Sequence, residues 1–331
     1  MAILITGSAG FIGSHLTKKL VFQYPNEKII ALDKLTYAGD LNNISDISER
    51  NNFKFIEGDI CDNLLLDNIF KDEEINTVFH LAAESHVDNS ISNPLEFVNT
   101  NVLGTVNLLE KSKELKSNPN FTFFHISTDE VFGSLSKKED SFTEKSGYSP
   151  NSPYSASKAA SDHFVRAYSQ TYGMQYIITN CSNNFGPNQH EEKLIPVVLK
   201  SIIQKKPIPV YGDGKNVRDW LYVGDHVNAL LSLYNSNYRN ETFCIGGGVE
   251  LSNLELIKIL CKETDKILGN QMNSESLIKF VTDRAGHDFR YSINNSKITK
   301  SINWSPSQDF ELKIRETIEY YLKSFQSTLF K

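Results

Sequence analysis

The sequence predicts an α/β fold in which a doubly wound parallel sheet carries a smaller C-terminal α/β lobe. Short, continuously apolar runs alternate with helical patterns through the first half, which is typical of parallel strands covered on both faces. A glycine-rich turn joins the first apolar run to the first helical pattern. After about residue 185, prolines interrupt this alternation and separate helical segments follow. At 331 residues the chain is long enough for two lobes.

The expected strands of the larger lobe are short, and helical patterns lie between several of them. The strands are expected at residues 2–6, 28–33, 53–59, 77–83, 121–127 and 176–182. The clearest helices are expected at residues 14–24, 98–115, 153–172 and 251–268. Residues 219–234 again read as a strand followed by a helix. We therefore expect one domain from residues 1–185, with 214–245 returning to it, and a second lobe mainly from residues 186–331.

Composition narrows the range of partners. The formal net charge of −6 disfavours nucleic acid. The four cysteines are scattered without a CxxC pair, which is typical of a reduced, cytoplasmic protein rather than of a disulfide or zinc framework. His80, His86 and His125 form no metal-ligand pattern, so no metal is expected. No apolar run is long enough to span a membrane, and no membrane partner is expected.

The turn "TGSAGFIG" places three glycines directly after a strand and before a helix. The spacing is GxxGxxG: Gly7 allows a tight turn, Gly10 lets the backbone approach a pyrophosphate, and Gly13 lets helix and strand pack closely. The N-terminus of the helix then faces the phosphates. Such a turn also occurs as a purely structural link between a strand and a helix. Residues at the ends of the neighbouring strands are needed to distinguish a dinucleotide-binding turn from a structural one.

Residues at those strand ends favour NAD as the bound dinucleotide. Asp33 ends the second strand, where an acid binds the adenosine ribose hydroxyls and repels the 2′-phosphate of NADP, although Lys34 weakens this preference. Asp59 ends the third strand, where it can meet the adenine, and residues 81–85 end the fourth. Ligands of open α/β sheets bind along this edge, so the sequence predicts a Rossmann-type NAD site.

A tyrosine and a lysine lie four residues apart on a well-delimited helix, Tyr154 and Lys158. Ser152 can cap this helix, Pro153 can begin it and Gly173 can end it. The pair shares a face, although chance pairs with this spacing are common on helix surfaces. A tyrosine base near neutral pH needs its pKa of about 10 lowered by about three units, or roughly 4 kcal/mol. One ammonium at about 4 Å supplies about that much at an effective dielectric near 20, so the pair beside NAD can remove a hydroxyl proton.

The stretch "HISTDEVFGS" ends the fifth apolar run on two adjacent acids, Asp129 and Glu130. Neighbouring residues of a regular strand point to opposite faces, so both acids can reach one substrate only if the strand has already ended. Gly133 is compatible with such a turn. Two carboxylates in one site push their pKa values apart, so one can be protonated while the other is charged. The alternative is a solvated loop that carries a helix-start signal.

Several ordered motifs along nearly the whole chain carry a family resemblance. They are "TGSAGFIGS", "LDKLTYAG", "GDI", "LAAESHVD", "STDEVFG", "YSASKAASD", "NNFGPNQHEEKLIP", "RDWLYVGDH" and "DRAGHDFRY". With them the sequence resembles the extended short-chain dehydrogenases/reductases and, more narrowly, the dTDP-glucose 4,6-dehydratases. That family often has tyrosine at Phe132 and Phe185, proline at Ala285 and glycine at Ser8, and none of these positions carries an expected proton-transfer group.

The resemblance implies an NAD-dependent lyase that converts dTDP-glucose to dTDP-4-keto-6-deoxyglucose for deoxysugar biosynthesis, such as that of rhamnose. Tyr154 would take the proton of the 4-hydroxyl while NAD accepts hydride from carbon 4, with Thr128 hydrogen-bonded to the 4-oxygen. Glu130 would then remove the proton on carbon 5, and Asp129 would protonate the departing 6-hydroxyl. Hydride would finally return to carbon 6.

The same resemblance assigns binding residues to both ligands. For NAD they are Gly7, Gly10, Phe11, Ile12, Gly13, Asp33, Lys34, Leu35, Thr36, Asp59, Ile60, Leu81, Ala82, Ala83, Ser85, Thr100, Tyr154, Lys158 and Asn184. For the nucleotide sugar they are Ser85, Thr128, Asn183, Lys193, Leu194, Pro209, Tyr211, Arg218, Asn253, Arg284 and His287. Arg218 and Arg284 suit the diphosphate because a guanidinium fork matches phosphate oxygens, and Tyr211 can stack near the base.

Other readings of the site stay open at this point. A 4-epimerase or a decarboxylase of the same superfamily would need the Tyr154–Lys158 pair and NAD but not two acids after Thr128. Another nucleotide-sugar 4,6-dehydratase would differ only in the base, for which thymidine rests on the resemblance alone. An NAD-sensing binding protein would have no reason to hold the pair and both acids together. The fold family also implies a homodimer, through helices around residues 98–115 and 156–170.

Overall fold

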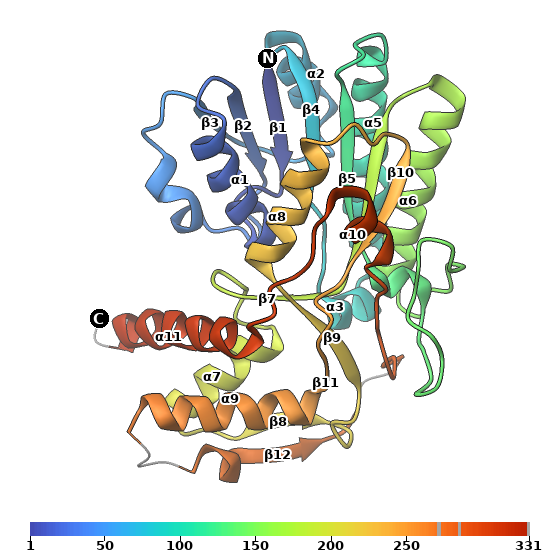
Figure 1. Ribbon diagram of the computed structural model, residues 1–331. Coiled ribbons are helices and arrows are strands. Elements are labelled where there is room, and N and C mark those ends of the chain that lie inside the picture. Colours follow the sequence, from blue (N-terminus) through green and yellow to red (C-terminus); the bar gives the residue numbers. More distant parts are fainter. Residues whose placement is uncertain (270–272, 284–285, 330–331) are drawn as a thin grey trace.

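The computed structural model describes residues 1–269, 273–283 and 286–329 and has a large seven-stranded parallel sheet at its centre (Figure 1). The strand order is β10-β6-β5-β4-β1-β2-β3. The strands are β1 Ala2–Thr6, β2 Lys28–Asp33, β3 Phe53–Glu57, β4 Ile75–His80, β5 Thr122–Thr128, β6 Tyr176–Cys181 and β10 Glu241–Ile245. The predicted doubly wound α/β fold is confirmed.

Alternate residues of these strands face two separate apolar cores. On β1, Ile3 and Ile5 join the core that includes Leu16, whereas Leu4 joins the core that includes Leu108 and Val165. This alternation follows from the two-residue period of a strand. Because both faces are covered by helices, the strands are continuously apolar, which is the pattern that the sequence analysis used.

Helices cover both faces of the large sheet, and α1 packs against α8 on one of them. The longer ones are α1 Phe11–Gln23, α2 Asn63–Asp72, α5 Gly104–Ser112, α6 Pro153–Tyr172 and α8 Val223–Tyr234. The shorter ones are η1 Leu41–Ile47, α3 Val87–Ser92, α4 Pro94–Phe97, η3 Lys113–Leu115, η4 Asp129–Phe132 and α10 Ser296–Ile302. The helix expected at residues 98–115 instead begins as a π-helix, η2 Val98–Leu103, continues as α5 and ends as the 3₁₀ turn η3. Such π segments are frequent at functional sites.

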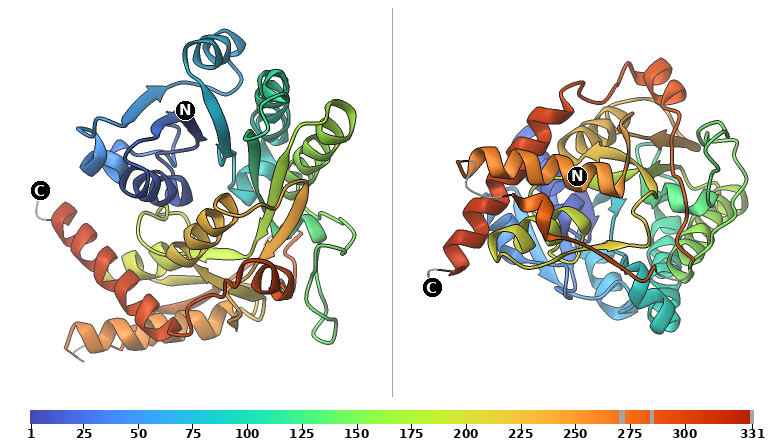
Figure 2. Two further views of the ribbon diagram at one scale, coloured as in Figure 1. Left: turned by 45° about the horizontal axis from the view of Figure 1, so that its top comes forward. Right: turned by 90° about the horizontal axis from the view of Figure 1, so that it is seen from below.

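The smaller lobe lies below the large sheet in Figure 1 and has its own apolar core. Its strands are β7 Asn183–Phe185, β8 Ile208–Tyr211, β9 Val217–Tyr222, β11 Glu250–Ser252 and β12 Ile278–Val281. Its helices are α7 Leu194–Ile203, α9 Asn253–Ile267, η5 Ser274–Leu277 and α11 Phe310–Leu329. Helices α7, α9 and α11 pack on one another (Figure 2).

The chain crosses between the lobes more than once. β10, which follows the small-lobe strand β9, pairs with β6 as the edge strand of the large sheet. Leu221, Leu230 and Phe243 belong to the same apolar core as Ile3 of the first strand. The strand-then-helix pattern expected at 219–234 is therefore present as β9 and α8, and α8 covers the large sheet.

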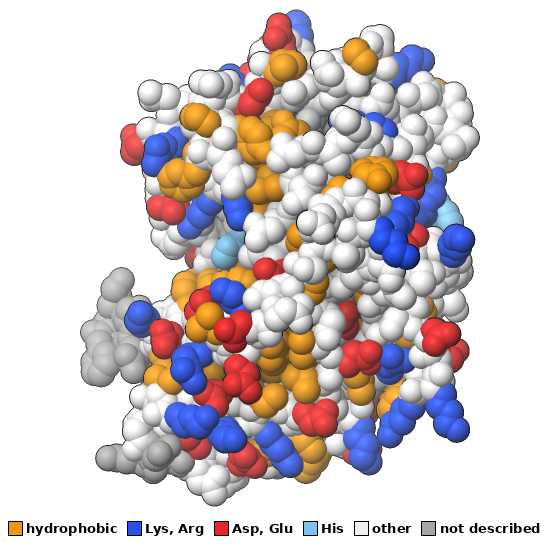
Figure 3. Space-filling view, viewed as in Figure 1, with side chains coloured by type: hydrophobic (Ala, Val, Ile, Leu, Met, Phe, Trp, Pro, Cys, Tyr) orange, Lys and Arg blue, Asp and Glu red, His pale blue; other side chains and the backbone are white. Residues whose placement is uncertain are grey.

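The surface carries charges of both signs. Over the lower part of the face in Figure 3, lysine and arginine side chains alternate with aspartate and glutamate. Among the residues that the structure describes, no helix is both long and apolar enough to cross a membrane. Within the same residues, no group of histidines, cysteines and acids is placed to hold a metal ion.

Candidate active site

A cavity of about 320 Å³ lies at the carboxyl edge of the large sheet, against the small lobe. Its lining comes from the ends of β1 to β6 and the segments that follow them, where ligands of such sheets bind. It brings together these predicted residues: Gly7, Gly10, Phe11, Ile12, Gly13, Asp33, Lys34, Thr36, Asp59, Ile60, Leu81, Ala82, Ala83, Ser85, Thr100, Thr128, Asp129, Glu130, Tyr154, Lys158, Asn183, Asn184 and Lys193. The sequence thus places most of its candidate residues around one space.

The glycine turn tolerates no side chain at two of its three positions. Gly7 has a φ of +69°, and a Cβ there would lie 2.7 Å from the backbone nitrogen of Ala82. A Cβ on Gly13 would lie 1.9 Å from the carbonyl oxygen of Gly7. Gly10 is the N-cap of α1, and no side chain caps the first N–H groups of that helix. A close turn that presents an uncapped helix N-terminus to the cavity fits the pyrophosphate of a dinucleotide.

Asp33 braces this turn as well as facing the cavity. Its Oδ2 accepts a hydrogen bond of 2.9 Å from the backbone of Ala9, and its Oδ1 accepts one of 2.8 Å from the backbone of Leu35. Each carboxylate oxygen has a further lone pair for a ribose hydroxyl. Lys34 lies 2.8 Å from the Oδ2 of Asp59, so the cation that weakened the preference for NAD is paired with an acid of the same edge.

The two adjacent acids begin a 3₁₀ turn directly after β5, as the sequence predicted. β5 ends at Thr128, whose Oγ1 accepts a hydrogen bond of 3.2 Å from the backbone of Glu130. Gly133 closes the turn at a φ of +90°. Since the strand has ended, Asp129 and Glu130 no longer point to opposite faces, and both line the cavity.

The surroundings of Asp129 favour its protonated form. Its side chain lies inside the protein, with 1% of the residue exposed. Burial raises the pKa of Asp129 well above its usual range, and the negative charges of Glu130 and Asp219 raise it further, against the opposing effect of Arg218. A neutral carboxylic acid beside a second acid is the arrangement that general acid–base chemistry needs.

The helix α6 begins and ends as predicted. Ser152 is its N-cap and accepts a hydrogen bond of 3.1 Å from the backbone of Ser155, and Gly173 ends it at a φ of 76°. Tyr154 and Lys158 both line the cavity from this helix. The Nζ of Lys158 donates a hydrogen bond of 2.8 Å to the carbonyl of Ile126, on the strand that leads to the acids.

The expectation that Lys158 lowers the pKa of Tyr154 is wrong for the protein's own groups. Burial raises the pKa of Tyr154 well above its usual range, and the charges of Glu130 and Asp129 add to this effect. Burial also lowers the pKa of Lys158 to about 8, although Asp162 opposes this. The calculation of 4 kcal/mol from an ammonium neglected the desolvation of the phenolate, which here is the leading cause.

Several predicted substrate residues do not line this cavity. They are Leu194, Pro209, Tyr211, Arg218, Asn253 and His287, all from the second half of the chain. The predicted cofactor residue Leu35 does not line the cavity either, because it packs against the apolar core. Arg284 lies outside the described residues. The guanidinium of Arg218 is buried, where it donates to the carbonyls of Val217 and Asp288 at 2.8 and 3.1 Å. The Nδ1 of His287 lies 2.7 Å from the Oδ1 of Asp283, so this imidazole is paired with an acid outside the cavity.

The cavity also contains residues that the sequence analysis did not name. They are Leu32, Ala38, Gly39, Gly58, Glu84, Ile126, Ser127, Cys181, Ser182, Gln189, His190 and Glu192. Most lie beside a predicted residue, and Cys181 ends β6, so applying the strand-edge rule to that strand would have found it. Gln189, His190 and Glu192 come from a loop after β7, and only the family motif "NNFGPNQHEEKLIP" pointed to them.

The fold and this cavity define a site of the short-chain dehydrogenase type that also contains two adjacent acids, Asp129 and Glu130. Residues 4–317 match the family model described as GDP-mannose 4,6 dehydratase, and the chain belongs to this family. The resemblance to the dTDP-glucose 4,6-dehydratases is likewise confirmed by relatives of that name. The Salmonella typhimurium protein is 46% identical over 98% of this chain and 94% of its own, and an Escherichia coli protein is 44% identical over the same shares.

Solved structures agree with these relatives. The dTDP-glucose 4,6-dehydratase of Streptomyces venezuelae, with NAD bound, has a TM-score of 0.91 at 40% identity and covers 99% of this chain and 98% of its own. That of Bacillus anthracis, in complex with NAD, has a TM-score of 0.87 at 40% identity over 98% of both chains. A UDP-glucose 4-epimerase from Thermotoga maritima has a TM-score of 0.87 at 28% identity, over 98% of this chain and 100% of its own.

Proposed function

We propose that this protein dehydrates dTDP-glucose to dTDP-4-keto-6-deoxyglucose with NAD as its cofactor. The observation that carries the proposal is the position of Asp129 and Glu130 in the same cavity as Tyr154 and Lys158. An epimerase uses the tyrosine and lysine but has no need of two acids for elimination. The relatives named dTDP-glucose 4,6-dehydratase, at 44–46% identity over nearly the full chain, support the same choice. The four cysteines of this protein are free thiols, which is consistent with the reducing cytoplasm as its location.

Bound NAD would accept hydride from carbon 4 of the sugar and return it to carbon 6. Gly7, Gly10 and Gly13 would hold its pyrophosphate at the N-terminus of α1, and Asp33 its ribose. Tyr154 would take the proton of the 4-hydroxyl as the general base. Burial and the nearby acids favour the protonated phenol of Tyr154. This step therefore depends on the positive charge of the nicotinamide ring once NAD is bound.

The acid pair would carry out the elimination. Oxidation at carbon 4 makes the proton on carbon 5 acidic, and Glu130, which is less buried than Asp129, would remove it and give a proton back to carbon 5 when hydride reaches carbon 6. Asp129 holds a proton that it can give to the departing 6-hydroxyl, because burial favours its neutral form. Thr128 would donate to the 4-oxygen from the end of β5. The role of Asp129 as the acid matches the protonated form that its surroundings favour.

The nucleotide sugar would lie between the lobes. Ser85, Asn183 and Lys193 line the cavity, where the Nζ of Lys193 donates a hydrogen bond of 3.1 Å to the carbonyl of Ser85. The side chain of Lys193 is 34% exposed, so its ammonium can meet a phosphate oxygen. Further residues of the second lobe are proposed to bind the diphosphate and base: Leu194, Pro209, Tyr211, Arg218, Asn253, Arg284 and His287.

We also propose that the protein is a homodimer. Large apolar side chains are exposed on the outer face of α3, α4, η2 and α6, which pack on one another: Ile91, Leu95, Val98, Leu103, Phe164 and Tyr172. Leu95 is 72% exposed and Leu103 49%. An apolar cluster on adjoining helices marks a protein–protein interface. A second copy of this chain fits this cluster because η2 and α6 belong to the helices, around residues 98–115 and 156–170, that pair in the fold family.

One assay tests the proposed reaction. The protein is incubated with dTDP-glucose and NAD, and the mixture is treated with alkali and examined for the absorbance of a 4-keto-6-deoxy sugar. UDP-, CDP- and GDP-linked sugars in parallel identify the base. Formation of the 4-epimer without this absorbance would show that the protein is an epimerase and not a dehydratase. NAD binding with no conversion of any sugar would leave only a binding protein.

A further inference from the structure

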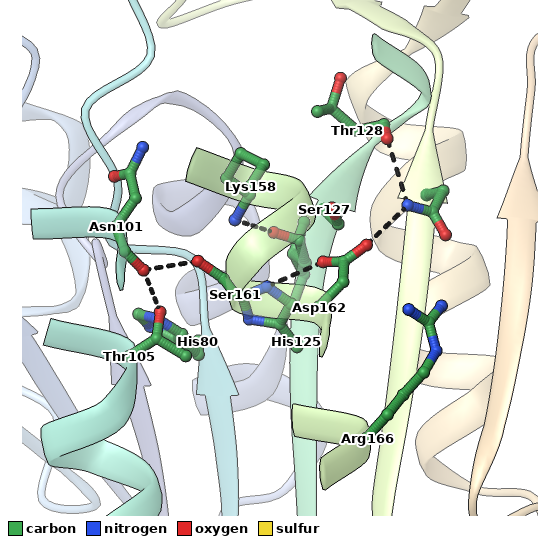
Figure 4. Close-up of polar contacts among 12 residues, drawn as sticks. His80, Asn101, Thr105, His125, Ser127, Thr128, Lys158, Ser161, Asp162 and Arg166 are labelled. Atoms are coloured by element: carbon green, nitrogen blue, oxygen red, sulfur yellow. Dashed lines mark hydrogen bonds and ion pairs between the residues drawn. The ribbon is translucent and has the colours of Figure 1, made fainter. Parts of the chain in front are cut away.

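A buried carboxylate, Asp162, lies behind the cavity and has no place in the reaction described above. It follows Lys158 by four residues on α6, so the two side chains lie on the same side of the helix. Asp162 and Lys158 are 0% and 4% exposed. Figure 4 shows Asp162 directed from the helix toward His125 on the neighbouring strand.

Neutral groups hold the Asp162 carboxylate in place. The Nε2 of His125 lies 3.1 Å from its Oδ1, the hydroxyl of Tyr148 donates a hydrogen bond of 2.6 Å to its Oδ2, and the amide of Asn180 donates one of 3.2 Å. Burial lowers the pKa of His125 to about 4, so the imidazole is neutral at physiological pH. Burial acts to raise the pKa of Asp162, but contacts that include His125 and Lys158 outweigh it and the pKa is lowered.

Within the described residues, Lys158 is a cation that no carboxylate contacts directly. Its Nζ bonds a carbonyl, that of Ile126, and burial favours loss of its proton. Two groups oppose this loss, Asp162 first and Cys181 second. Burial raises the pKa of Cys181 to about 12, so its thiol is neutral and contributes no charge near pH 7. The negative charge that faces Lys158 is therefore that of Asp162.

We propose that Asp162 is a positioning residue whose buried negative charge keeps Lys158 protonated beside Tyr154 and thereby sets the alkaline limit of the reaction. The groups that face the pair are His80 from β4, His125 from β5, Cys181 from β6, Tyr148 from the segment before α6, and Tyr154 and Arg166 from α6 itself. Arg166 donates a hydrogen bond of 2.9 Å to the hydroxyl of Tyr148, and the charge of Asp162 helps to raise the pKa of Arg166. The kinetic consequence rests on the proposed function, whereas the pairing of charges does not.

A stability cycle tests the pairing without any assay of activity. Asp162→Asn, Lys158→Met and the double variant are compared with the parent by thermal unfolding. Asp162→Asn leaves a buried ammonium without its counter-charge and should lower the unfolding temperature by about 5 °C or more. Adding Lys158→Met should then restore part of that loss. If the two substitutions are additive, or if the double variant is no more stable than Asp162→Asn, Asp162 is only a hydrogen-bond acceptor and the proposal is overturned.

The pH profile tests the consequence for the reaction. In Asp162→Asn the alkaline limb of kcat/KM should move down by on the order of one pH unit, because Lys158 loses its proton more easily. Tyr148→Phe is the matched control, since it removes a hydrogen bond from the same carboxylate and keeps the charge. Its alkaline limb should stay in place. An unmoved limb in an active Asp162→Asn protein, or the same downward movement in both variants, would overturn the proposal.

Discussion

Replacement of Glu130 by glutamine should separate the two halves of the proposed reaction. The amide has nearly the same shape but cannot take a proton from carbon 5. Loss of a positioned general base costs about 10²- to 10⁴-fold in rate, or roughly 2.7–5.5 kcal/mol of activation free energy. Oxidation at carbon 4 uses Tyr154 instead, so it should continue.

The surroundings of Glu130 predict what happens to its neighbours. Its charge contributes to the raised pKa of both Asp129 and Tyr154, but burial is the leading cause for each. In Glu130→Gln, Asp129 therefore stays protonated and able to act as the acid. The pKa of Tyr154 moves down, since one negative charge has gone. Oxidation should be no slower than in the parent, and its pH dependence should move toward lower pH.

Stopped-flow absorbance of the nicotinamide measures this directly. With dTDP-glucose, Glu130→Gln should accumulate reduced cofactor in a fast phase and then convert slowly, and the sugar should retain its carbon 5 hydrogen in heavy water. Glu139→Gln, on an exposed acid of the segment that follows the same turn, is the control and should behave as the parent does. Elimination at the parental rate would refute the role of Glu130 as the base for carbon 5. An equal loss of both steps would instead assign Glu130 to the oxidation.

Three further outcomes are expected. Gly13→Ala should lower the unfolding temperature by several degrees because its Cβ would lie 1.9 Å from a backbone oxygen, whereas Gly10→Ala, with 3.4 Å to its nearest neighbour, should change it little. In light scattering, Leu95→Glu should turn a dimer into a monomer, and Leu64→Glu, at the same 72% exposure on a helix outside the proposed interface, should remain a dimer. The rate should fall as pH rises through the pKa of Lys158, about 8, because the cation is then lost; a rate that stays level there would contradict its role.

The sequence predicted the large sheet well because its signals are local. Continuous apolar runs such as residues 2–6 and 28–33 are strands in the structure, and α6 ends at the expected glycine, Gly173. The exact ends of strands were less accurate. β3 and β4 end at Glu57 and His80, earlier than the expected ends at residues 59 and 83, and the residues that follow each strand line the cavity.

Electrostatic properties were harder to predict, because they depend on burial. The charge of Lys158 was visible in the sequence, but the partial burial of Tyr154 beside two acids was not, so the predicted direction of the shift in the pKa of Tyr154 was wrong. The pairing of Asp162 with His125 joins α6 to β5 across 37 positions of the chain. No periodicity of either segment indicates such a contact, since it arises only when helix and strand pack.

The end of β5 connects these features, because consecutive residues of one stretch serve different parts of the site. His125 holds Asp162, and the carbonyl of Ile126 holds Lys158. Thr128 caps the turn that presents the two acids, Asp129 and Glu130. Since a shift of one position would exchange the faces of the strand, the register of β5 determines where Lys158 is held relative to both acids. The apolar run and the acidic turn are therefore one functional element, in which burial of the strand positions the groups that react.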